Sequence, residues 1–403
     1  LMLFDNTKIG FDLKSDFELK RALFLFKVIS NSTLTKIGTS LLKLYSSIWF
    51  LFFKQYDIFS VIFLEQIYRQ FCAGLDHKTS MKTVNKLFSK NVYSYLHYSV
   101  EGGKNDASFD IHCQSVINSI EFASTKKNLP FTVFKPTAIG RITEYEKSDV
   151  NQSIYNRFDR ICKKAFEKNI KILIDAEESW VQDSIDNLVE MMMKKYNKEN
   201  TIVFNTVQMY RHDRLDYLKT LLESAKKNNF KIGVKLVRGA YIEKENKRAK
   251  SLKYESPICV SKQATDANFD KGVDYILSNL NVFSLFCGTH NEESLYKIID
   301  SIRYKGLEKK SNKIWLAQLY GMSDHITFNL ANENYNVVKY LPWGPIHQVL
   351  PYLIRRAEEN TSVKGQTSRE LSLIRNEISR RKKVKKTGLH LKKKKARKSG
   401  PHL

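Results

Sequence analysis

The stretch TIVFNTVQMYRHDRLDYLKTLLESAKKNNFKIGVKLVRGAY, residues 201–241, holds two apolar runs of strand character on either side of a charged segment that can form a helix. A connection of that length predicts parallel strands, because parallel neighbours need a crossover between them. Outward in both directions, the same alternation repeats along the chain. The eight candidate strands span residues 93–102, 131–139, 171–178, 201–210, 232–241, 285–291, 314–322 and 337–344.

Eight strand and helix units over about 270 residues match the size of a (β/α)8 TIM-like barrel. A doubly wound open sheet is the alternative, but no GxGxxG follows the first strand, as a dinucleotide-binding unit of that fold would want. Residues 1–90 precede the strands and are predicted to be helical. In this region, DFELKRALFLFKVI places apolar residues at helical spacing behind Asp16, a candidate N-cap.

The composition is that of a globular protein with an unusual end. A chain of 403 residues with 42% hydrophobic and 12% aromatic residues can form a sizeable core. The formal net charge is +25. Residues 380–403 contain twelve Lys or Arg and no Asp or Glu, so the remainder of the chain carries 25 − 12 = +13. This basic run predicts a solvated, disordered tail. It can bind nucleic acid or anionic lipid loosely, or serve only to solubilise the chain.

Neither the cysteines nor the most apolar segment indicates a secreted or membrane-spanning protein. Residues 47–66 are too short and too interrupted by charge to span a bilayer, so we predict a buried helical hairpin. Peripheral contact with the inner membrane is left open. An odd number of cysteines and no signal peptide predict a cytoplasmic protein without disulfides. The five cysteines form no CxxC pair or metal-ligand spacing: Cys72, Cys113, Cys162, Cys259 and Cys287.

In a (β/α)8 barrel the functional side chains gather where the strands end. Here these ends are polar, aromatic and cationic, whereas ends that served only stability would more often finish in a simple turn residue. Their joint occurrence on successive strands indicates an active site. The residues concerned are Lys135, Asp175, Glu177, Gln208, Tyr210, Lys235, Arg238, Tyr241, Thr289, His290, Asn291, Gln318, Leu319, Tyr320 and Tyr340.

Each of these residues also has a structural interpretation. Asp175 can cap the next helix, which is the commoner fate of an Asp after a strand. His290 is a lone histidine without an HxH or HExxH motif, so no metal site is predicted. Lys135 and Lys235 can be Schiff-base nucleophiles, as in barrel aldolases, although neither has a visible partner that would lower its pKa.

Seven segments, taken in order, resemble the proline dehydrogenase family: FKPTAIGR, LIDAEESW, VFNTVQMY, VKLVRGAYIEKE, GTHNEES, QLYGMSDH and YLPWGPIHQVLPYLIRRAEENTS. The resemblance runs from about residue 10 to Arg380, is closest to single-function enzymes of the Bacteroidetes type, and is highly specific when the motifs are taken together. It implies a flavoenzyme that uses FAD to oxidise L-proline to Δ1-pyrroline-5-carboxylate and passes the electrons to a quinone.

The resemblance also implies a substrate site. Lys135, Arg355 and Arg356 would clamp the proline carboxylate, since the planar fork of arginine suits a carboxylate better than a lone ammonium does. Asp175 would be catalytic by orienting and balancing this cationic cluster. The residues that would wall the pyrrolidine ring are Tyr241, Leu319 and Tyr340.

Spacing and resemblance disagree about the two arginines. In a regular barrel the helix after the eighth strand runs away from the rim, and at 1.5 Å per residue it would carry Arg355 roughly 15 Å from it. Spacing therefore favours ordinary surface arginines. The resemblance instead implies a distorted barrel, in which the turn from Pro342 to Pro345 redirects the last helix over the barrel mouth.

For the cofactor, the resemblance implies that Lys235 is a catalytic cation beside the flavin, at a position where many relatives carry arginine. Lysine keeps the positive charge and loses the bidentate geometry. His97 stands where an aspartate is expected. The residues that would bind FAD are Ala176, Gln208, Arg238, Gly239, Ala240, Thr289 and His290.

The expected organisation is a helical region (1–90), an FAD-binding catalytic barrel (91–379) and a basic tail (380–403). Hydroxyproline is an alternative substrate, with its ring hydroxyl accommodated near Tyr340. A Schiff-base aldolase would carry a strand lysine without flavin. The hypothesis of a basic nucleic-acid-binding protein depends on the tail alone. The tail has no interleaved aromatic residues and no zinc-binding motif, so no specific nucleic acid is expected.

Overall fold

The structure is a computed structural model of the chain, and it describes residues 2–30, 58–98, 105–147, 151–346, 349–350, 352–354 and 364–398. The chain divides into two compact units. The division falls after Phe71 rather than near residue 90, because helix α5 (His77–Phe88) packs on the first strand. The larger unit comprises Cys72–Met322 and Leu330–Gln348, and the smaller one comprises Leu1–Phe71, Ser323–Asn329 and Val349–Leu403.

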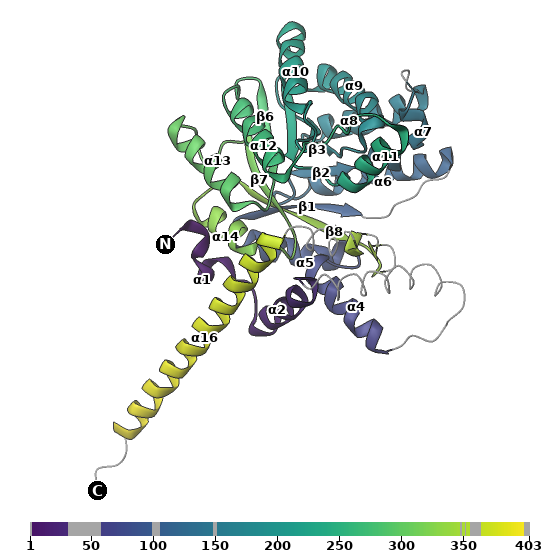
Figure 1. Cartoon of the computed structure of the whole chain (residues 1–403). Helices are drawn as coiled ribbons and strands as arrows, with labels where there is room; N and C mark the ends of the chain where they lie inside the picture. Colours follow the sequence, from purple (N-terminus) through teal and green to yellow (C-terminus); the bar gives the residue numbers. More distant parts are fainter. Residues whose placement is uncertain are drawn as a thin grey trace. The chain divides into compact units, whose positions relative to one another are not determined.

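The larger unit is built on eight parallel strands (Figure 1). Their hydrogen-bonded order is β1-β8-β7-β6-β5-β4-β3-β2, and β1 and β2, at the two ends of that order, also lie next to each other. The sheet therefore curls into a nearly closed (β/α)8 barrel, which confirms the predicted fold class and excludes the open sheet. The strands are β1 (Val92–Tyr98), β2 (Phe131–Phe134), β3 (Lys171–Ile174), β4 (Val203–Gln208), β5 (Ile232–Val237), β6 (Phe283–Gly288), β7 (Ile314–Leu319) and β8 (Val337–Trp343).

Helices cover the outside of this sheet, and neighbouring helices pack on one another (Figure 1). In α8, Ile154, Phe158, Ile161 and Ala165 recur at helical spacing and are all buried, which is the pattern of a helix with one face on a core. The other elements of this unit are α6 (Asp106–Ser124), η2 (Pro136–Ala138), α7 (Ile142–Tyr145), α8 (Gln152–Glu167), α9 (Ser179–Tyr196), α10 (Arg214–Asn228), α11 (Ile242–Leu252), α12 (Lys262–Leu277) and α13 (Glu292–Tyr304).

The barrel interior is a packed aromatic core. Phe131 meets Phe204, Phe286 and Trp315 edge-on, with ring centroids 6.0, 4.9 and 5.0 Å apart, an arrangement that aromatic pairs favour. Because side chains alternate across a strand, the next inward position along each strand lies above this core, at the strand ends. The cluster consists of Tyr95, Phe131, Val133, Leu173, Phe204, Phe286, Trp315, Ala317 and Val338.

The smaller unit is helical. Its helix α2 begins with a capping box in which the hydroxyl of Ser15 accepts from the Glu18 N–H at 3.1 Å and the Glu18 carboxylate accepts from the Ser15 N–H at 2.7 Å. The N-cap is therefore Ser15, one residue before the predicted Asp16. The elements are η1 (Leu3–Asp5), α1 (Thr7–Gly10), α2 (Asp16–Ser30), α4 (Ile58–Phe71), α14 (Asp324–Asn332, which continues into the larger unit) and α16 (Lys364–Lys398).

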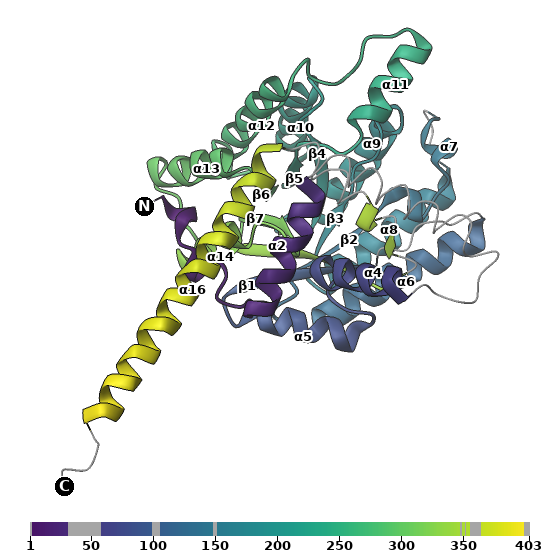
Figure 2. The same cartoon turned by 60° about the horizontal axis from the view of Figure 1, so that its bottom comes forward.

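Helix α16 passes without a break through the segment expected to be a disordered tail, and it ends at Lys398. Figure 2 shows α2 beside its first half. Arg381 donates to the carbonyl oxygens of Phe11 and Lys14 at 2.9 and 2.8 Å and pairs with Asp16 at 3.1 Å. The first turn of the basic segment is thus part of the smaller unit.

Two expectations concern membranes and metals. Most of the apolar segment 47–66 lies outside the described residues, and its last part, from residue 58 on, belongs to α4. Among the residues that the structure describes, no helix is long and apolar enough to cross a membrane. Within the same ranges, no group of His, Cys, Asp and Glu side chains could hold a metal ion.

Candidate active site

The inward positions at the strand ends form one ring of side chains, here called the rim layer. Seven of them lie two residues beyond a core residue on their own strand, or pair in register with such a position, and Gln208 lies four residues beyond the core residue Phe204 on β4. The alternation of the strands therefore directs all eight positions into the barrel. Six of the eight residues of the rim layer were predicted from the sequence to contact a ligand or to be catalytic. The rim layer consists of His97, Lys135, Asp175, Gln208, Lys235, Gly288, Leu319 and Tyr340.

At the centre of the rim layer is an ion pair between Lys235 and Asp175, with Nζ 2.6 Å from Oδ1 and side chains only 13% and 18% exposed. Burial acts to raise the pKa of Asp175, but the charges of Lys235 and His97 outweigh it and hold that pKa below its usual value. The carboxylate stays ionised. The cap interpretation of Asp175 is wrong, because α9 begins at Ser179 with Glu178 as its N-cap.

Glu177 is a functional candidate to which sequence reasoning gave no role. One carboxylate oxygen accepts from the Thr137 hydroxyl at 2.5 Å, and the other accepts from the Tyr241 hydroxyl at 3.1 Å. Burial raises the pKa of Glu177, and the charge of Lys135 offsets this only in part. Glu177 therefore joins the segments that follow β2, β3 and β5. Its position two residues after Asp175, on the same face of the chain, was the signal available in the sequence.

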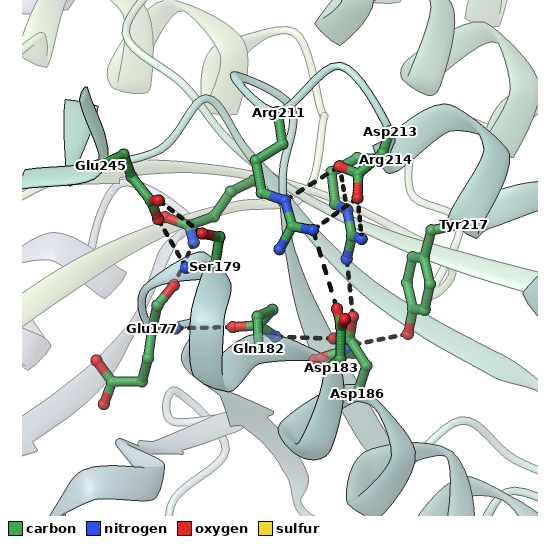
Figure 3. Close-up of polar contacts among 12 residues, drawn as sticks. Glu177, Ser179, Gln182, Asp183, Asp186, Arg211, Asp213, Arg214, Tyr217 and Glu245 are labelled. Carbon is green, nitrogen blue, oxygen red and sulfur yellow. Dashed lines mark hydrogen bonds and ion pairs between the residues drawn. The ribbon is translucent and has the colours of Figure 1, made fainter. Parts of the chain in front are cut away.

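A buried polar network holds the backbone of Glu177 from behind (Figure 3). Its N–H donates to Gln182 Oε1 at 2.8 Å, and Gln182 Nε2 donates to Asp186 Oδ1 at 2.7 Å. Arg214 pairs with Asp186 at 2.8 Å, with both side chains 7% exposed. On its other side, the Glu177 carbonyl accepts from Gln208 Nε2 at 2.8 Å. The network thus links the start of α10 to a rim-layer amide.

Charge within this network is balanced. Burial opposes the charge of Arg214, but its hydrogen bonds to Asp213 and the charge of Asp186 outweigh burial and raise the pKa of Arg214. Asp213 receives both Arg214 and Arg211 at 2.6 Å. Against the opposing effect of burial, these arginines lower the pKa of Asp213 to about 2. Asp213 and Arg214 therefore remain charged and paired. Burial raises the pKa of Asp186, and the charge of Arg214 with the hydrogen bonds from Asn205 and Gln182 offsets this only in part.

Tyr340 forms one wall of the rim layer and is held at two points. Its hydroxyl oxygen lies 2.5 Å from His97 Nδ1, and its ring meets the Tyr95 ring edge-on with centroids 5.3 Å apart. Leu319 is its register partner on β7. The buried Lys339 fixes the carbonyl of Leu319, to which its Nζ donates at 3.1 Å. The two predicted wall residues are therefore adjacent and rigidly supported.

Arg238 has a structural role that the sequence did not predict. Its guanidinium donates to Asp266 at 2.6 Å, to the Thr289 hydroxyl at 2.8 Å and to the Ser294 hydroxyl at 2.9 Å. It also stacks on Phe269, with 4.3 Å from Cζ to the ring centroid. Three of its five N–H donors are used, and they tie the end of β5 to α12, to α13 and to the segment after β6. The predicted cofactor residues Arg238 and Thr289 are thus brought into direct contact.

The remaining predicted cofactor residues lie beside these. Gly239 has φ +136°, and a Cβ there would meet the Tyr210 ring at 2.5 Å, so only glycine fits. Ala240 follows it and is exposed, whereas Ala176 is buried between Asp175 and Glu177. His290 Nε2 accepts from the Leu319 N–H at 3.5 Å, a long contact. Asn291, not His290, caps α13.

Arg355 and Arg356 lie outside the described residues, and so does most of the segment that would carry the last helix over the barrel mouth. The apolar positions at helical spacing after Pro345 predict one buried helix face, formed by Ile346, Val349, Leu350, Leu353 and Ala357. Of these, Val349, Leu350 and Leu353 are described and buried, Ile346 is described and half-buried, and Ala357 lies outside the described residues. Of the three residues predicted to clamp a carboxylate, only Lys135 is among the described residues, and its charge acts on both Asp175 and Glu177.

A TIM-like barrel whose strand ends bring together lysines, carboxylates and aromatic side chains has the arrangement of an enzyme active site. A family model described as "Proline dehydrogenase" matches residues 80–369. The chain therefore belongs to the proline dehydrogenase family, a family of oxidoreductases.

Two individual proteins match the chain over most of its length. The chain is 32% identical over 372 residues to "Carbapenem antibiotics biosynthesis protein CarD" of Pectobacterium carotovorum subsp. carotovorum, covering 90% of this chain and 95% of that protein. It is 28% identical over 443 residues to "Proline dehydrogenase 1, mitochondrial" of Dictyostelium discoideum, covering 94% and 76%.

Among solved structures, the chain is similar to proline utilization A (PutA) from Bdellovibrio bacteriovorus inactivated by N-propargylglycine. The TM-score is 0.70 at 18% identity, covering 88% of this chain and 38% of that one. At this identity the likeness concerns the fold alone. The chain spans about two fifths of the length of that protein.

Proposed function

We propose that this chain oxidises L-proline to Δ1-pyrroline-5-carboxylate, with FAD as its redox group and a quinone as electron acceptor. The observation that carries the proposal is the Lys235–Asp175 ion pair, set in one rim layer with Tyr340 and Leu319. The family assignment supports proline as the substrate. Two hydrogens leave the ring C–N bond, which becomes C=N, and they reach the quinone as two electrons and two protons.

The residues present fit a small cyclic amino acid. Lys135 supplies a cation for the carboxylate, and Arg355 and Arg356 would complete the clamp. Asp175 balances this positive charge. Tyr241, whose pKa burial raises well above its ordinary value, stays protonated and is oriented by Glu177. Leu319 and Tyr340 offer flat apolar surfaces to a five-membered ring.

The residues present also fit a flavin. On β6 the rim-layer position is Gly288, so the rim layer carries no side chain on this strand. A Cβ added there would come within 3.1 Å of the Val237 side chain. Lys235 lies on the neighbouring strand β5 and Gln208 on the next strand β4. They offer a cation and an amide, which suit a planar ring with carbonyl and imide groups. FAD, when bound, takes up the hydrogen pair from the substrate. Ala176, Arg238, Gly239, Ala240, Thr289 and His290 would hold the rest of the cofactor.

The acceptor and the location complete the proposal. A quinone is a membrane-soluble acceptor, so a cytoplasmic enzyme would meet it by peripheral contact with the inner membrane. The basic end of α16 supports such contact, since each Lys or Arg near an anionic surface contributes about 1 kcal/mol.

Steady-state assays test the proposal directly. We expect the purified protein to reduce a soluble quinone only when L-proline is added, and to release a cyclic imine that an aromatic amino-aldehyde traps. Acid extraction should release FAD. Quinone reduction without the imine product would overturn the proposed reaction.

Hydroxyproline is the second candidate substrate. The hydroxyl of Tyr340, held by His97, is a polar group in the wall where a ring hydroxyl would lie. Comparing kcat/KM for L-proline and trans-4-hydroxy-L-proline decides between them, and we expect L-proline to be preferred.

A further inference from the structure

We propose that His97 is a positioning residue of the substrate pocket, which holds the Tyr340 hydroxyl through Nδ1 and so keeps the tyrosine ring as a fixed wall. This proposal rests on the proposed function, in which Tyr340 contacts the proline ring. The contact joins residues 243 positions apart, on strands β1 and β8, which pair with each other. Their pairing brings both side chains to the rim layer.

The geometry supports a specific and rigid contact. The Nδ1 to Oη distance of 2.5 Å is at the short end for a hydrogen bond. The two rings are tilted by 56° with centroids 5.6 Å apart, so the imidazole meets the hydroxyl and does not stack on the phenol ring. At its other edge, the Tyr340 ring rests on Tyr95.

A ring held at both ends has one position. Tyr95 prevents the ring from sinking toward the core, and His97 prevents its hydroxyl from swinging toward the opening of the barrel. Without His97, Tyr340 would keep its packing on Tyr95 but lose the point that fixes its outer end. A substrate would then have to order this side chain on binding, which costs affinity.

His97 also faces the ion pair of the rim layer. Its charge is one of the influences that hold the Asp175 carboxylate ionised, after that of Lys235. An acidic residue at position 97 would reverse the sign of that influence. His97 therefore has two separable effects, one through Nδ1 on Tyr340 and one through charge on Asp175, and substitutions can distinguish them.

The choice of substitution follows from the atom used. In asparagine the side-chain amide reaches the position of Nδ1, whereas in glutamine it reaches the position of Nε2. His97→Asn should therefore retain the contact with Tyr340, and His97→Gln and His97→Phe should lose it. His112→Asn is the matched control, because His112 also bonds through Nδ1, to the carbonyl of Ala138, but lies on α6 outside the barrel.

For full-length protein, we expect His97→Phe and His97→Gln to raise KM for L-proline roughly five- to tenfold, as the loss of one hydrogen bond predicts, with kcat changed less than twofold. His97→Asn should remain within about twofold of the wild type in KM. The dissociation constant of a non-oxidisable five-membered-ring carboxylate should follow KM. In the Tyr340→Phe background, His97→Phe should raise KM no more than His97→Asn does, because the shared contact is already gone and both substitutions remove the charge.

Several outcomes would overturn the proposal. Equal KM for His97→Asn and His97→Phe would show that Nδ1 is not the atom used. Additive effects of His97→Phe and Tyr340→Phe would show that the two residues act separately. If His97→Phe fails to fold, as judged by circular dichroism, the asparagine and glutamine pair carries the test. If the wild-type protein does not oxidise L-proline, the proposed function is wrong. If the wild type is active and the His97 variants are unaffected, only the role of His97 is wrong.

Discussion

Asp175 and Glu177 are two residues apart and have carboxyl pKa values shifted in opposite directions. Asp175 lies beside the ammonium of Lys235, which outweighs the effect of burial and lowers its pKa. Glu177 receives two hydroxyl donors, and burial raises its pKa. Environments that separate the pKa values of neighbouring acids assign them different roles. Asp175 serves as a fixed negative charge, and Glu177 orients Tyr241.

Replacing Asp175 tests the first of these roles. We expect Asp175→Ala to lower kcat/KM for L-proline by roughly a hundredfold or more, as losses of preorganised charge at active sites do. The reason is that Lys235 loses its partner and the cationic cluster is no longer balanced. Far-UV circular dichroism should be unchanged, since a strand-end carboxylate contributes little to the core. Normal kinetics in this variant would remove Asp175 from the catalytic machinery.

Glu177→Gln tests the second role. The variant keeps an oxygen acceptor for one hydroxyl but presents an N–H group to the other, so one of the contacts with Thr137 and Tyr241 is lost. We expect KM to rise by about fivefold, in line with one lost hydrogen bond, while kcat stays within about twofold. Thr137→Val should show the same trend to a lesser degree. A fall in kcat with unchanged KM would instead place Glu177 at the reacting atoms.

At the scale of elements, the network behind β3 and β4 connects α9 and α10 to the rim layer. The buried pair of Arg214 and Asp186 is its anchor. Removing one member of a buried pair leaves the other charge without compensation, which costs about 3–5 kcal/mol. We therefore expect Arg214→Met to lower the free energy of unfolding by about that amount in urea titrations.

The double variant Arg214→Met with Asp186→Leu is the informative companion. It removes both charges and should recover part of the loss, as replacements of whole ion pairs by apolar groups often do. Arg160→Met is the matched control, because Arg160 is half exposed and its partner Asp110 is exposed. A loss in the Arg160 variant equal to that in the Arg214 variant would contradict the anchoring role.

Asp213 gives this network a pH dependence. Its pKa is lowered to about 2 in the folded protein, below the value near 3.9 of an unfolded chain. Such a group adds stability that is fully present above the unfolded pKa and is lost as the pH falls toward the folded pKa. The stability difference between wild type and Asp213→Asn should thus be constant from pH 7 to 5 and shrink below about pH 4. A difference independent of pH down to 3 would contradict the ion pairs.

Much of the barrel could be predicted from the sequence, because its strands are short β-branched or aromatic runs separated by amphipathic segments. The rim layer followed from strand ends and the period of two. The contacts of Glu177 could not be predicted, because Tyr241 is 64 positions away in the sequence and only the closed barrel brings the two side chains together. The tie from Arg238 to Asp266 was missed for the same reason. The start of α2 was misplaced by one residue, because Ser15 and Asp16 are both good caps and backbone geometry chooses between them.

At the scale of the whole molecule, the basic C-terminal segment has two parts. Arg381 and Lys385 both pair with Asp16 of the smaller unit, and the buried Glu377 lies one turn before them. We expect truncation after Lys386 to leave the thermal unfolding midpoint within about 2 °C of the wild type, and truncation after Arg380 to lower it by about 2–4 °C. Equal midpoints for the two truncations would show that Arg381 contributes nothing.

Neither truncation should change the oxidation of L-proline with a soluble quinone, because the rim layer lies wholly in the larger unit. Activity with a quinone embedded in anionic vesicles should fall in both, and the loss should diminish at high salt. Unchanged activity on vesicles would separate the basic segment from the acceptor.

The proposed function requires that this barrel hold a flavin that L-proline reduces. The most direct measurement is the visible absorbance spectrum of the purified full-length protein, recorded before and after anaerobic addition of L-proline. We expect a flavin band that is bleached by L-proline and restored by a quinone, and that is not bleached in Asp175→Ala on the same time scale. A protein without a flavin band after incubation with FAD, or a band that L-proline leaves unchanged, would contradict the proposed function.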